Sequence, residues 1–290
     1  MSYLIFAILI FGIFDSTLGN LEAVKDDELV ELIRNEKYLI VLFTQKNCEE
    51  CSNLENELIG LREVLVEEID AWVVKVENSQ MTRLYSPGSV EPVLVFFRHG
   101  IPLLYHGEPN EEEILQMFTA NKEPVSKELT DETFEHLTQA GTGATTGDWF
   151  VMFYTSDCIE CQRLQAIWEA VGAKIKSRTN IARVNRATTG AATARRFNIY
   201  EVPAFVFFRL GKMYRYNFGE LDVDSLVTFA QNSYRHMKHE SVPTPKTPFD
   251  DLIALIIVYL KDYPWLWQAG LGIFCIIVLE ILRRIVMSRR

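Results

Sequence analysis

Two runs of aromatic and β-branched residues stand out from the alternation of hydrophobic and polar positions along the chain. The first run covers 38–44 and the second covers 149–155. Their length and composition predict buried strands. Each run is followed by a short polar turn and then by apolar positions at helical spacing, which extend to Ser177 in the second case. The chain therefore contains the same strand–turn–helix pattern twice.

Further elements repeat around both runs, so that internal duplication determines the architecture. A helix is predicted before each run, over 26–36 and from Asp131 onward. Pro92 and Pro203 each begin a later hydrophobic strand, and a glycine turn follows each of these strands. The other expected elements are strands at 71–76 and 101–105 and helices at 81–85, 111–119 and 222–235.

Four of the five cysteines occupy equivalent places in the two units. Cys48 and Cys51 follow the first run, and Cys158 and Cys161 follow the second, 110 residues further along the chain. Two cysteines three positions apart in the first turn of a helix lie on one face. Free N–H groups and the helix dipole favour a thiolate there, while Asp157 is expected to cap the second helix. The spacing predicts two dithiol/disulfide couples.

Each unit resembles a thioredoxin domain, and the chain resembles a membrane-anchored member of the protein disulfide isomerase family over residues 21–237. The CxxC pairs, and a proline 41 or 42 residues after the second cysteine, carry the resemblance. It implies an α/β fold of two tandem thioredoxin-like domains, each a central mixed sheet flanked by helices, plus one C-terminal transmembrane helix. The site residues that it implies are the attacking Cys48 and Cys158, the resolving Cys51 and Cys161, and the cis prolines Pro92 and Pro203 against the dithiols.

Several residues depart from the family pattern. Glutamates stand between the cysteines of both pairs, where like-charge repulsion disfavours a thiolate. Leu42 and Met152 stand where the family often buries a proton-accepting carboxylate, six residues before the first cysteine of each pair. Glu49 and Glu91 make the first site more acidic than the second, which has Ile159 at the position of Glu49. Cys158 is therefore predicted to be the more acidic attacking thiol.

Three functional interpretations remain. The first is a membrane-tethered thiol–disulfide oxidoreductase that acts on secretory-pathway proteins bearing thiols or disulfides. The second is a redox-inactive thioredoxin-like chaperone or binding module whose CxxC disulfides are structural. The third is zinc binding by four thiolates, which is disfavoured because the two pairs lie in separate units, unlike compact zinc ribbons. No cofactor and no metal site are predicted.

Composition and charge limit the partners and the compartment. A net charge of −10 argues against nucleic-acid binding. An apolar segment at 4–14, with small residues Thr17 and Gly19 after it, predicts a signal peptide at 1–19. Such a signal leads to an oxidising compartment, where CxxC chemistry has disulfides to act on.

An apolar stretch near the C-terminus predicts a membrane span at 264–287, with aromatic residues before it and arginines at its end. The resulting orientation is a single-pass type I protein of the endoplasmic reticulum membrane, with lumenal domains and a cytoplasmic tail at 288–290. The predicted domains are residues 20–123 and 124–237. A proline-containing linker with a short apolar helix is expected at 238–263.

Overall fold

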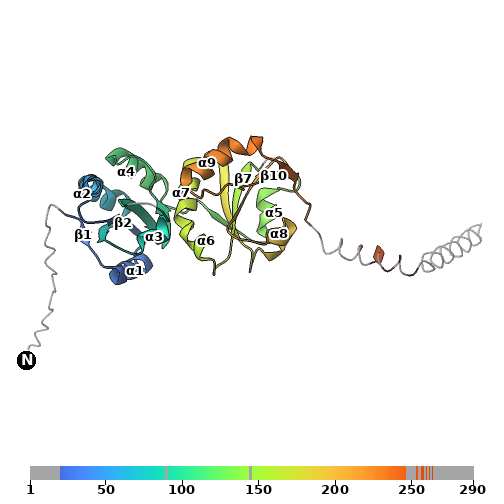
Figure 1. The fold of residues 1–290 in the computed structure, drawn as a ribbon, viewed down its shortest axis with the longest axis horizontal. Coiled ribbons are helices and arrows are strands. Elements are labelled where there is room, and N and C mark those ends of the chain that lie inside the picture. Colours follow the sequence, from blue (N-terminus) through green and yellow to red (C-terminus); the bar gives the residue numbers. More distant parts are fainter. Residues whose placement is uncertain are drawn as a thin grey trace, which may run out of the picture. The chain divides into compact units, whose positions relative to one another are not determined.

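The computed structural model describes residues 20–88, 91–143 and 146–245, and the single positions 253, 256, 257, 259, 261 and 263 (Figure 1). The chain divides into two compact parts, Met1–Pro243, which contains both sheets, and Thr244–Arg290. No helix among the described residues is long and apolar enough to span a membrane. The predicted signal peptide at 1–19 and the predicted span at 264–287 lie outside the described residues.

The first sheet is centred on β2 (Tyr38–Thr44), the first hydrophobic run. It has a neighbour on each side in the sheet, and all seven of its residues are buried, as is typical of a strand covered on both faces. It pairs in parallel with β3 (Trp72–Glu77) and antiparallel with β4 (Val93–Arg98). The strand order is β1-β3-β2-β4-β5. The remaining elements of this part are β1 (Glu22–Ala23), β5 (Ile101–Leu104), α1 (Asp26–Asn35), α2 (Glu49–Ile69), α3 (Thr82–Tyr85) and α4 (Glu111–Ala120).

The second sheet repeats this core around β7 (Asp148–Tyr154), the second hydrophobic run. β7 pairs in parallel with β8 (Thr179–Asn185) and antiparallel with β9 (Ala204–Arg209). The full order is β11-β10-β9-β7-β8-β6. The remaining elements are β6 (Lys127–Leu129), β10 (Lys212–Arg215), β11 (His239–Ser241), α5 (Thr133–Thr138), α6 (Ile159–Arg163), α7 (Gln165–Ile175), α8 (Ala191–Arg196), α9 (Val223–Gln231) and the 3-10 helix η1 (Ser233–His236). Two mixed sheets flanked by helices give the chain an α/β, thioredoxin-like fold, as expected.

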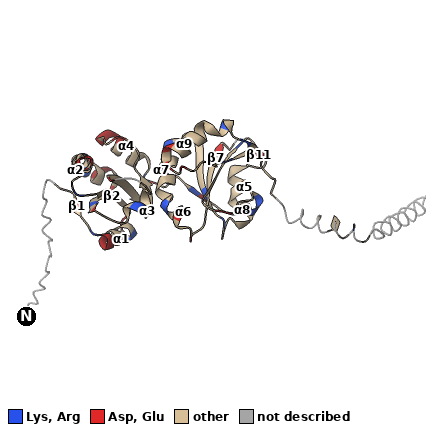
Figure 2. Ribbon diagram, viewed as in Figure 1, with Lys and Arg blue, Asp and Glu red and all other residues tan. Residues whose placement is uncertain are grey.

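Negative charge gathers at the helix N-termini of the first sheet's part. The first turns of α1, α2 and α4 contain only acidic charged residues (Figure 2). Asn110 caps α4 by accepting hydrogen bonds from the backbone N–H groups of Glu112 and Glu113. Carboxylates in a first turn interact favourably with the positive end of the helix dipole. The acidic residues of these three first turns therefore contribute to local helix stability.

Two predicted boundaries are corrected by the structure. The predicted linker at 238–263 begins too early, because β11 pairs antiparallel with β10. Val242, which follows β11, is 7% exposed and packs into a core cluster of the second sheet. A short edge strand needs no hydrophobic run, so the sequence pattern did not show it. The helix predicted from the second cysteine pair to Ser177 is divided at Leu164 into α6 and α7.

α7 contacts strands of both sheets, β5 and β8. Most of its residues are buried, including the charged Glu169, which is 2% exposed. The Glu169 carboxylate accepts a 2.9 Å hydrogen bond from the guanidinium of Arg98, at the end of β4, which has no exposed surface. Burial lowers the pKa of Arg98, and Glu169 opposes this shift. A buried ion pair thus joins the first sheet to the helix that follows the second cysteine pair.

Both members of this ion pair also bind the segment that connects the two sheets. Arg98 donates to the carbonyl oxygens of Asn121 and Glu123, at 3.1 and 3.3 Å. Glu169 accepts from the backbone N–H groups of Val125 and Ser126, at 2.8 and 3.1 Å. Buried charges need such partners, because each one has lost its hydration shell.

We expect Arg98→Met to lower the free energy of unfolding by about 3–5 kcal/mol, because it leaves the carboxylate of Glu169 buried without its cation. Arg209 is the matched control, since it occupies the equivalent position at the end of β9. Its side chain is 41% exposed and pairs with Asp148, so Arg209→Met should cost at most about 1 kcal/mol. Urea unfolding of both variants measures the difference, and equal losses would contradict the assigned role of the Arg98 pair.

Candidate functional site

The first cysteine pair lies at the start of α2, after the turn that follows β2. Cys48 is the N-cap residue of α2, and its sulfur accepts a 3.0 Å hydrogen bond from the backbone N–H of Cys51. A disulfide joins the two residues, whose Cα atoms are 5.2 Å apart. Cys51 is only 3% exposed, whereas Cys48 is partly exposed. One sulfur is therefore accessible from solvent while the other is covered.

The second pair has the same arrangement at the start of α6. Cys158 is the N-cap residue, its sulfur accepts a 3.0 Å hydrogen bond from the N–H of Cys161, and a disulfide joins the two. Cys161 is 3% exposed and Cys158 is partly exposed. The predicted pairing of cysteines at two helix N-termini is confirmed. In both places an N–H group of the first helical turn donates to the sulfur of the N-cap cysteine, which is the environment that stabilises a thiolate.

The two predicted cis prolines are confirmed as well. The peptide bonds Glu91–Pro92 and Val202–Pro203 are both cis. In the first site the carbonyl oxygen of Glu91 lies 3.8 Å from the Cys48 sulfur. The backbone just before β4 is thus placed beside the accessible sulfur, as the resemblance implied for Pro92.

The expected capping role of Asp157 is wrong. Because Cys158 itself is the N-cap, Asp157 lies one residue outside the helix and is exposed. A hydrogen bond with the Thr155 side chain, together with one to its own backbone, lowers the pKa of Asp157. This carboxylate therefore remains ionised close to the second site, although water screens it well.

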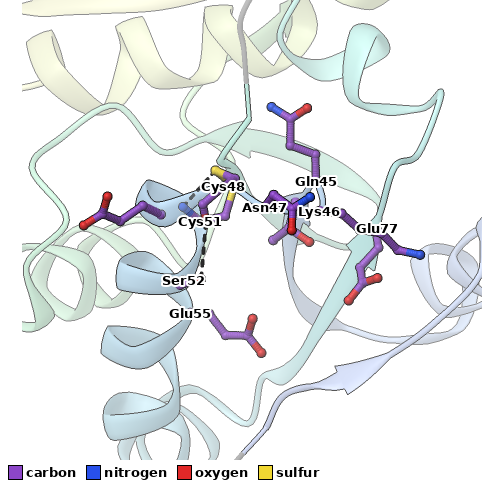
Figure 3. A pocket seen from close by; sticks show the side chains of 10 residues that line it. Gln45, Lys46, Asn47, Cys48, Cys51, Ser52, Glu55 and Glu77 are labelled. Carbon is purple, nitrogen blue, oxygen red and sulfur yellow. Dashed lines mark hydrogen bonds between the residues drawn. A yellow bond between two sulfur atoms is a disulfide. The ribbon is translucent and has the colours of Figure 1, made fainter.

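A polar pocket of about 510 Å³ adjoins the first disulfide (Figure 3). Two residues that line this pocket, Glu55 and Glu77, share the basic partner Lys75. The Nζ of Lys75, in β3, lies 2.8 Å from a carboxylate oxygen of Glu55 in α2 and 3.8 Å from one of Glu77. The ten residues that line the pocket are Thr44, Gln45, Lys46, Asn47, Cys48, Glu49, Cys51, Ser52, Glu55 and Glu77.

The corresponding charges of the second unit have other partners. Lys75 pairs with Leu42 in the strand register, and Arg183 pairs with Met152 in the same way. Arg183 donates a 2.6 Å hydrogen bond to Glu128 in β6, which also accepts from the Tyr154 hydroxyl. Burial, followed by that hydrogen bond, raises the pKa of Tyr154. The two units therefore share a backbone but not a polar environment.

The sequence reading missed the Lys75–Glu55 pair. The sequence feature that could have indicated it is a lysine between Val74 and Val76 in a hydrophobic strand. The charged end of such a side chain must bind a partner or reach water. Among the described residues, no group of three or more His, Cys, Asp or Glu side chains is arranged to hold a metal ion.

Comparison with known proteins agrees with this fold. Residues 125–232 match the family Thioredoxin. A "Thioredoxin domain-containing protein" from Theileria parva is 34% identical over 146 residues, which are 50% of this chain and 66% of that protein. The DnaJ homolog subfamily C member 10 of Xenopus laevis is 31% identical over 94 residues, which are 32% of this chain and 12% of that protein.

Among solved structures, ERdj5 form I has a TM-score of 0.42 at 18% identity, with 73% of this chain and 29% of that chain covered. The zinc-bound form of human ERp44 has a TM-score of 0.36 at 14% identity, with 73% of this chain and 57% of that chain covered. This chain spans less than two thirds of the length of each of these relatives. The segment that carries the second cysteine pair therefore matches the Thioredoxin family by sequence and has a thioredoxin-like fold.

We expect the reduced Cys158 to be the more acidic of the two attacking thiols. Glu49 and Glu91 flank Cys48, and their negative charges should raise the pKa of its thiol, whereas the residue after Cys158 is the exposed Ile159. Iodoacetamide alkylation rates against pH, with each pair measured after the other is replaced by serine, determine both values. The ranking is wrong if the pKa of the Cys48 thiol is equal to or lower than that of the Cys158 thiol.

The same assay tests the glutamate that precedes each second cysteine. Glu160→His should lower the pKa of Cys158, because it replaces a negative charge by a partly positive one near the sulfur. Glu160→Gln is the matched control, since it removes the negative charge and adds none. It should produce a smaller shift in the same direction.

Proposed function

We propose that the protein is a thiol–disulfide oxidoreductase that exchanges disulfides with secretory-pathway proteins through both cysteine pairs. The observation that carries the proposal is the N-cap position of Cys48 and of Cys158. Each sulfur already accepts a helix N–H and is partly exposed, with a second, covered cysteine bonded to it. This arrangement supports an attacking thiolate and a resolving thiol on one helical turn.

The proposed reaction moves two electrons. In reduced protein, the thiolate of Cys48 attacks a substrate disulfide, forms a mixed disulfide and releases one substrate sulfur as a thiolate. The thiolate of Cys51 then attacks the Cys48 sulfur, which forms the Cys48–Cys51 disulfide and releases the second substrate thiolate. The substrate is reduced and the pair is oxidised, and the reverse sequence introduces a disulfide into a substrate. Cys158 and Cys161 act in the same way in the second unit.

A second candidate is a redox-inactive chaperone or binding module whose two disulfides are structural. The carboxylates beside both pairs favour it. A dithiol whose thiolate is disfavoured is held more firmly as a disulfide. The reduction potential of each pair therefore separates the two candidates.

The compartment and the membrane tether are part of the proposal. The apolar N-terminal segment with its small residues supports entry into the secretory pathway, and the apolar stretch near the C-terminus supports a single span. Both cysteine pairs would then face the oxidising lumen of the endoplasmic reticulum, where disulfide exchange is chemically useful.

A redox titration of the full chain tests the oxidoreductase proposal. We expect each pair to equilibrate with glutathione buffers at a potential between about −270 and −180 mV, the range of thioredoxin and protein disulfide isomerase. Mass spectrometry after acid quenching and alkylation gives the thiol state of each pair separately. Potentials below about −300 mV for both pairs would identify them as structural disulfides instead.

Protease digestion of intact microsomes that contain the full chain tests the tether. We expect residues 20–243 to be protected until detergent is added, because the proposed topology places them in the lumen. Digestion of this part without detergent would overturn the topology and leave the proposed chemistry untouched.

A further inference from the structure

The turn that leads into the second cysteine pair is held by side chains from two other elements. It runs from Thr155, whose carbonyl oxygen accepts a 3.3 Å hydrogen bond from the backbone N–H of Cys158. Asn185, the last residue of β8, donates a 3.1 Å hydrogen bond to the hydroxyl of Ser156 in this turn. Gln162, in α6, donates a 2.8 Å hydrogen bond to the Ser156 carbonyl oxygen. One exposed residue of the turn is therefore fixed from a strand and from the cysteine-bearing helix.

Asn185 is itself held on its other side. It is only 6% exposed, and it pairs with Tyr154 in the sheet register. Its side-chain oxygen accepts a 3.0 Å hydrogen bond from the backbone N–H of Ala187, so its amide nitrogen is the group directed toward Ser156. A buried amide with a partner for each end is a rigid support for an exposed turn.

The turn before the first pair does not have this support. Lys46 occupies the position of Ser156 there, and its side chain is exposed. Ser52 occupies the position of Gln162, but its hydroxyl donates to the carbonyl oxygen of Cys48 and not to the turn. Within the part of the chain that the structure describes, no side chain donates a hydrogen bond to the turn before Cys48. The two sites therefore differ in how the backbone before the attacking cysteine is held.

This difference matters when the disulfide opens. In the oxidised protein the bond to Cys161 itself keeps the Cys158 sulfur at the Cys161 backbone N–H, 3.0 Å away. In the reduced protein the sulfurs are no longer joined, so the position of the Cys158 sulfur depends on the turn that precedes it. A hydrogen bond to the charged form of a group stabilises that form more than the neutral one. A turn that stays in place therefore preserves the donor that favours the attacking thiolate.

We propose that Asn185 and Gln162 are positioning residues of the second dithiol and act through Ser156. They keep the turn in place when the disulfide opens, so that the thiolate of Cys158 remains at the backbone N–H of Cys161. The inference rests on the proposed oxidoreductase function and deepens it. It adds no bond, proton or electron to the exchange reaction, but it makes the second pair the one whose thiolate is held ready for attack.

The experiment compares the full chain with a variant that carries both Ser156→Ala and Gln162→Ala, which removes both side-chain hydrogen bonds to the turn. Only the second pair is left to react, because three cysteines are replaced by serine in every protein compared: Cys48, Cys51 and Cys275. Iodoacetamide alkylation rates against pH give the pKa of the attacking thiol. Acid quenching and mass spectrometry give the equilibrium constant for reduction of the pair by glutathione at pH 8.

We expect the double variant to raise the pKa of the Cys158 thiol by roughly 0.5–1 unit, because its thiolate loses part of the stabilisation by the N–H donor. The reduced form is then less favoured, so the equilibrium constant for reduction should fall about three- to tenfold. This change corresponds to a reduction potential about 15–30 mV more negative. An unchanged pKa together with an unchanged equilibrium constant would overturn the inference.

Two further variants distinguish positioning from a general loss of structure. Ser156→Thr keeps a hydroxyl for Asn185 and should behave as the parent protein does, whereas Ser156→Ala alone should raise the pKa of the Cys158 thiol. Ser177→Ala, at an exposed serine after α7, should change neither quantity. Equal shifts in the Thr and Ala variants of Ser156 would contradict the assigned hydrogen bond.

A single substitution keeps the inference testable if the double variant does not fold. Gln162 is exposed on α6, and Gln162→Ala should by itself raise the pKa of the Cys158 thiol, by less than the double variant would. No rise in this variant would overturn the role of Gln162.

The same measurements test the underlying function separately. If the second pair of the parent protein does not equilibrate with glutathione, the oxidoreductase proposal for this pair fails, and the positioning role fails with it. If the parent equilibrates and the double variant does so with the same constant and the same thiol pKa, only the positioning role fails.

Discussion

The structure of residues 20–243 depends on one buried charge pair. Arg98 and Glu169 are 0% and 2% exposed, and either one alone would carry an uncompensated charge into the protein interior. Hydrogen bonds to one another and to the backbone of residues 121–126 hold both side chains, although the buried Nε of Arg98 has no partner among the described residues. Because the arginine belongs to the first sheet and the glutamate to α7, the pair can form only when the two repeats and their connection are folded together. Two duplicated domains thereby become one compact unit rather than two independent ones.

Through α7, the buried ion pair also restrains the helix that carries the second disulfide. The helix carrying Cys161 ends at Leu164, and α7 continues directly from there into contact with β5 of the first sheet. A site whose supporting helix is packed on several sides holds its geometry more closely than one on a free surface helix. The first disulfide has a different support, because α2 packs against α4 and against strands of its own sheet. The two sites are equivalent in backbone but not in how the rest of the chain restrains them.

Sequence patterns were sufficient for the central elements and insufficient for the contacts between repeats. β2 and β7 are continuous hydrophobic runs, as is typical of strands buried on both faces, and both were predicted to within one residue. β1, β6 and β11 have two or three residues each, and strands this short leave no readable period. Arg98 could not be predicted to be buried, because a charge at the end of a strand normally reaches water. Its partner lies 71 residues away in the other repeat.

The candidate site divides in the same way. The cysteine pairing and the cis prolines follow from local spacing and from the family resemblance, so the structure reproduces them in both units. The charged residues around the cysteine pairs could not be predicted from the spacing or from the resemblance. Leu42 and Met152 are apolar, so neither central strand has a carboxylate at this position. The residues that pair with them in the neighbouring strands, Lys75 and Arg183, are nevertheless basic. Lys75 takes its partner from the cysteine-bearing helix, and Arg183 takes its partner from the edge strand β6. A basic residue at the same register position therefore binds a glutamate of the cysteine-bearing helix in the first unit and a glutamate of an edge strand in the second. Duplicated sites can in this way differ in chemistry while their backbones stay alike.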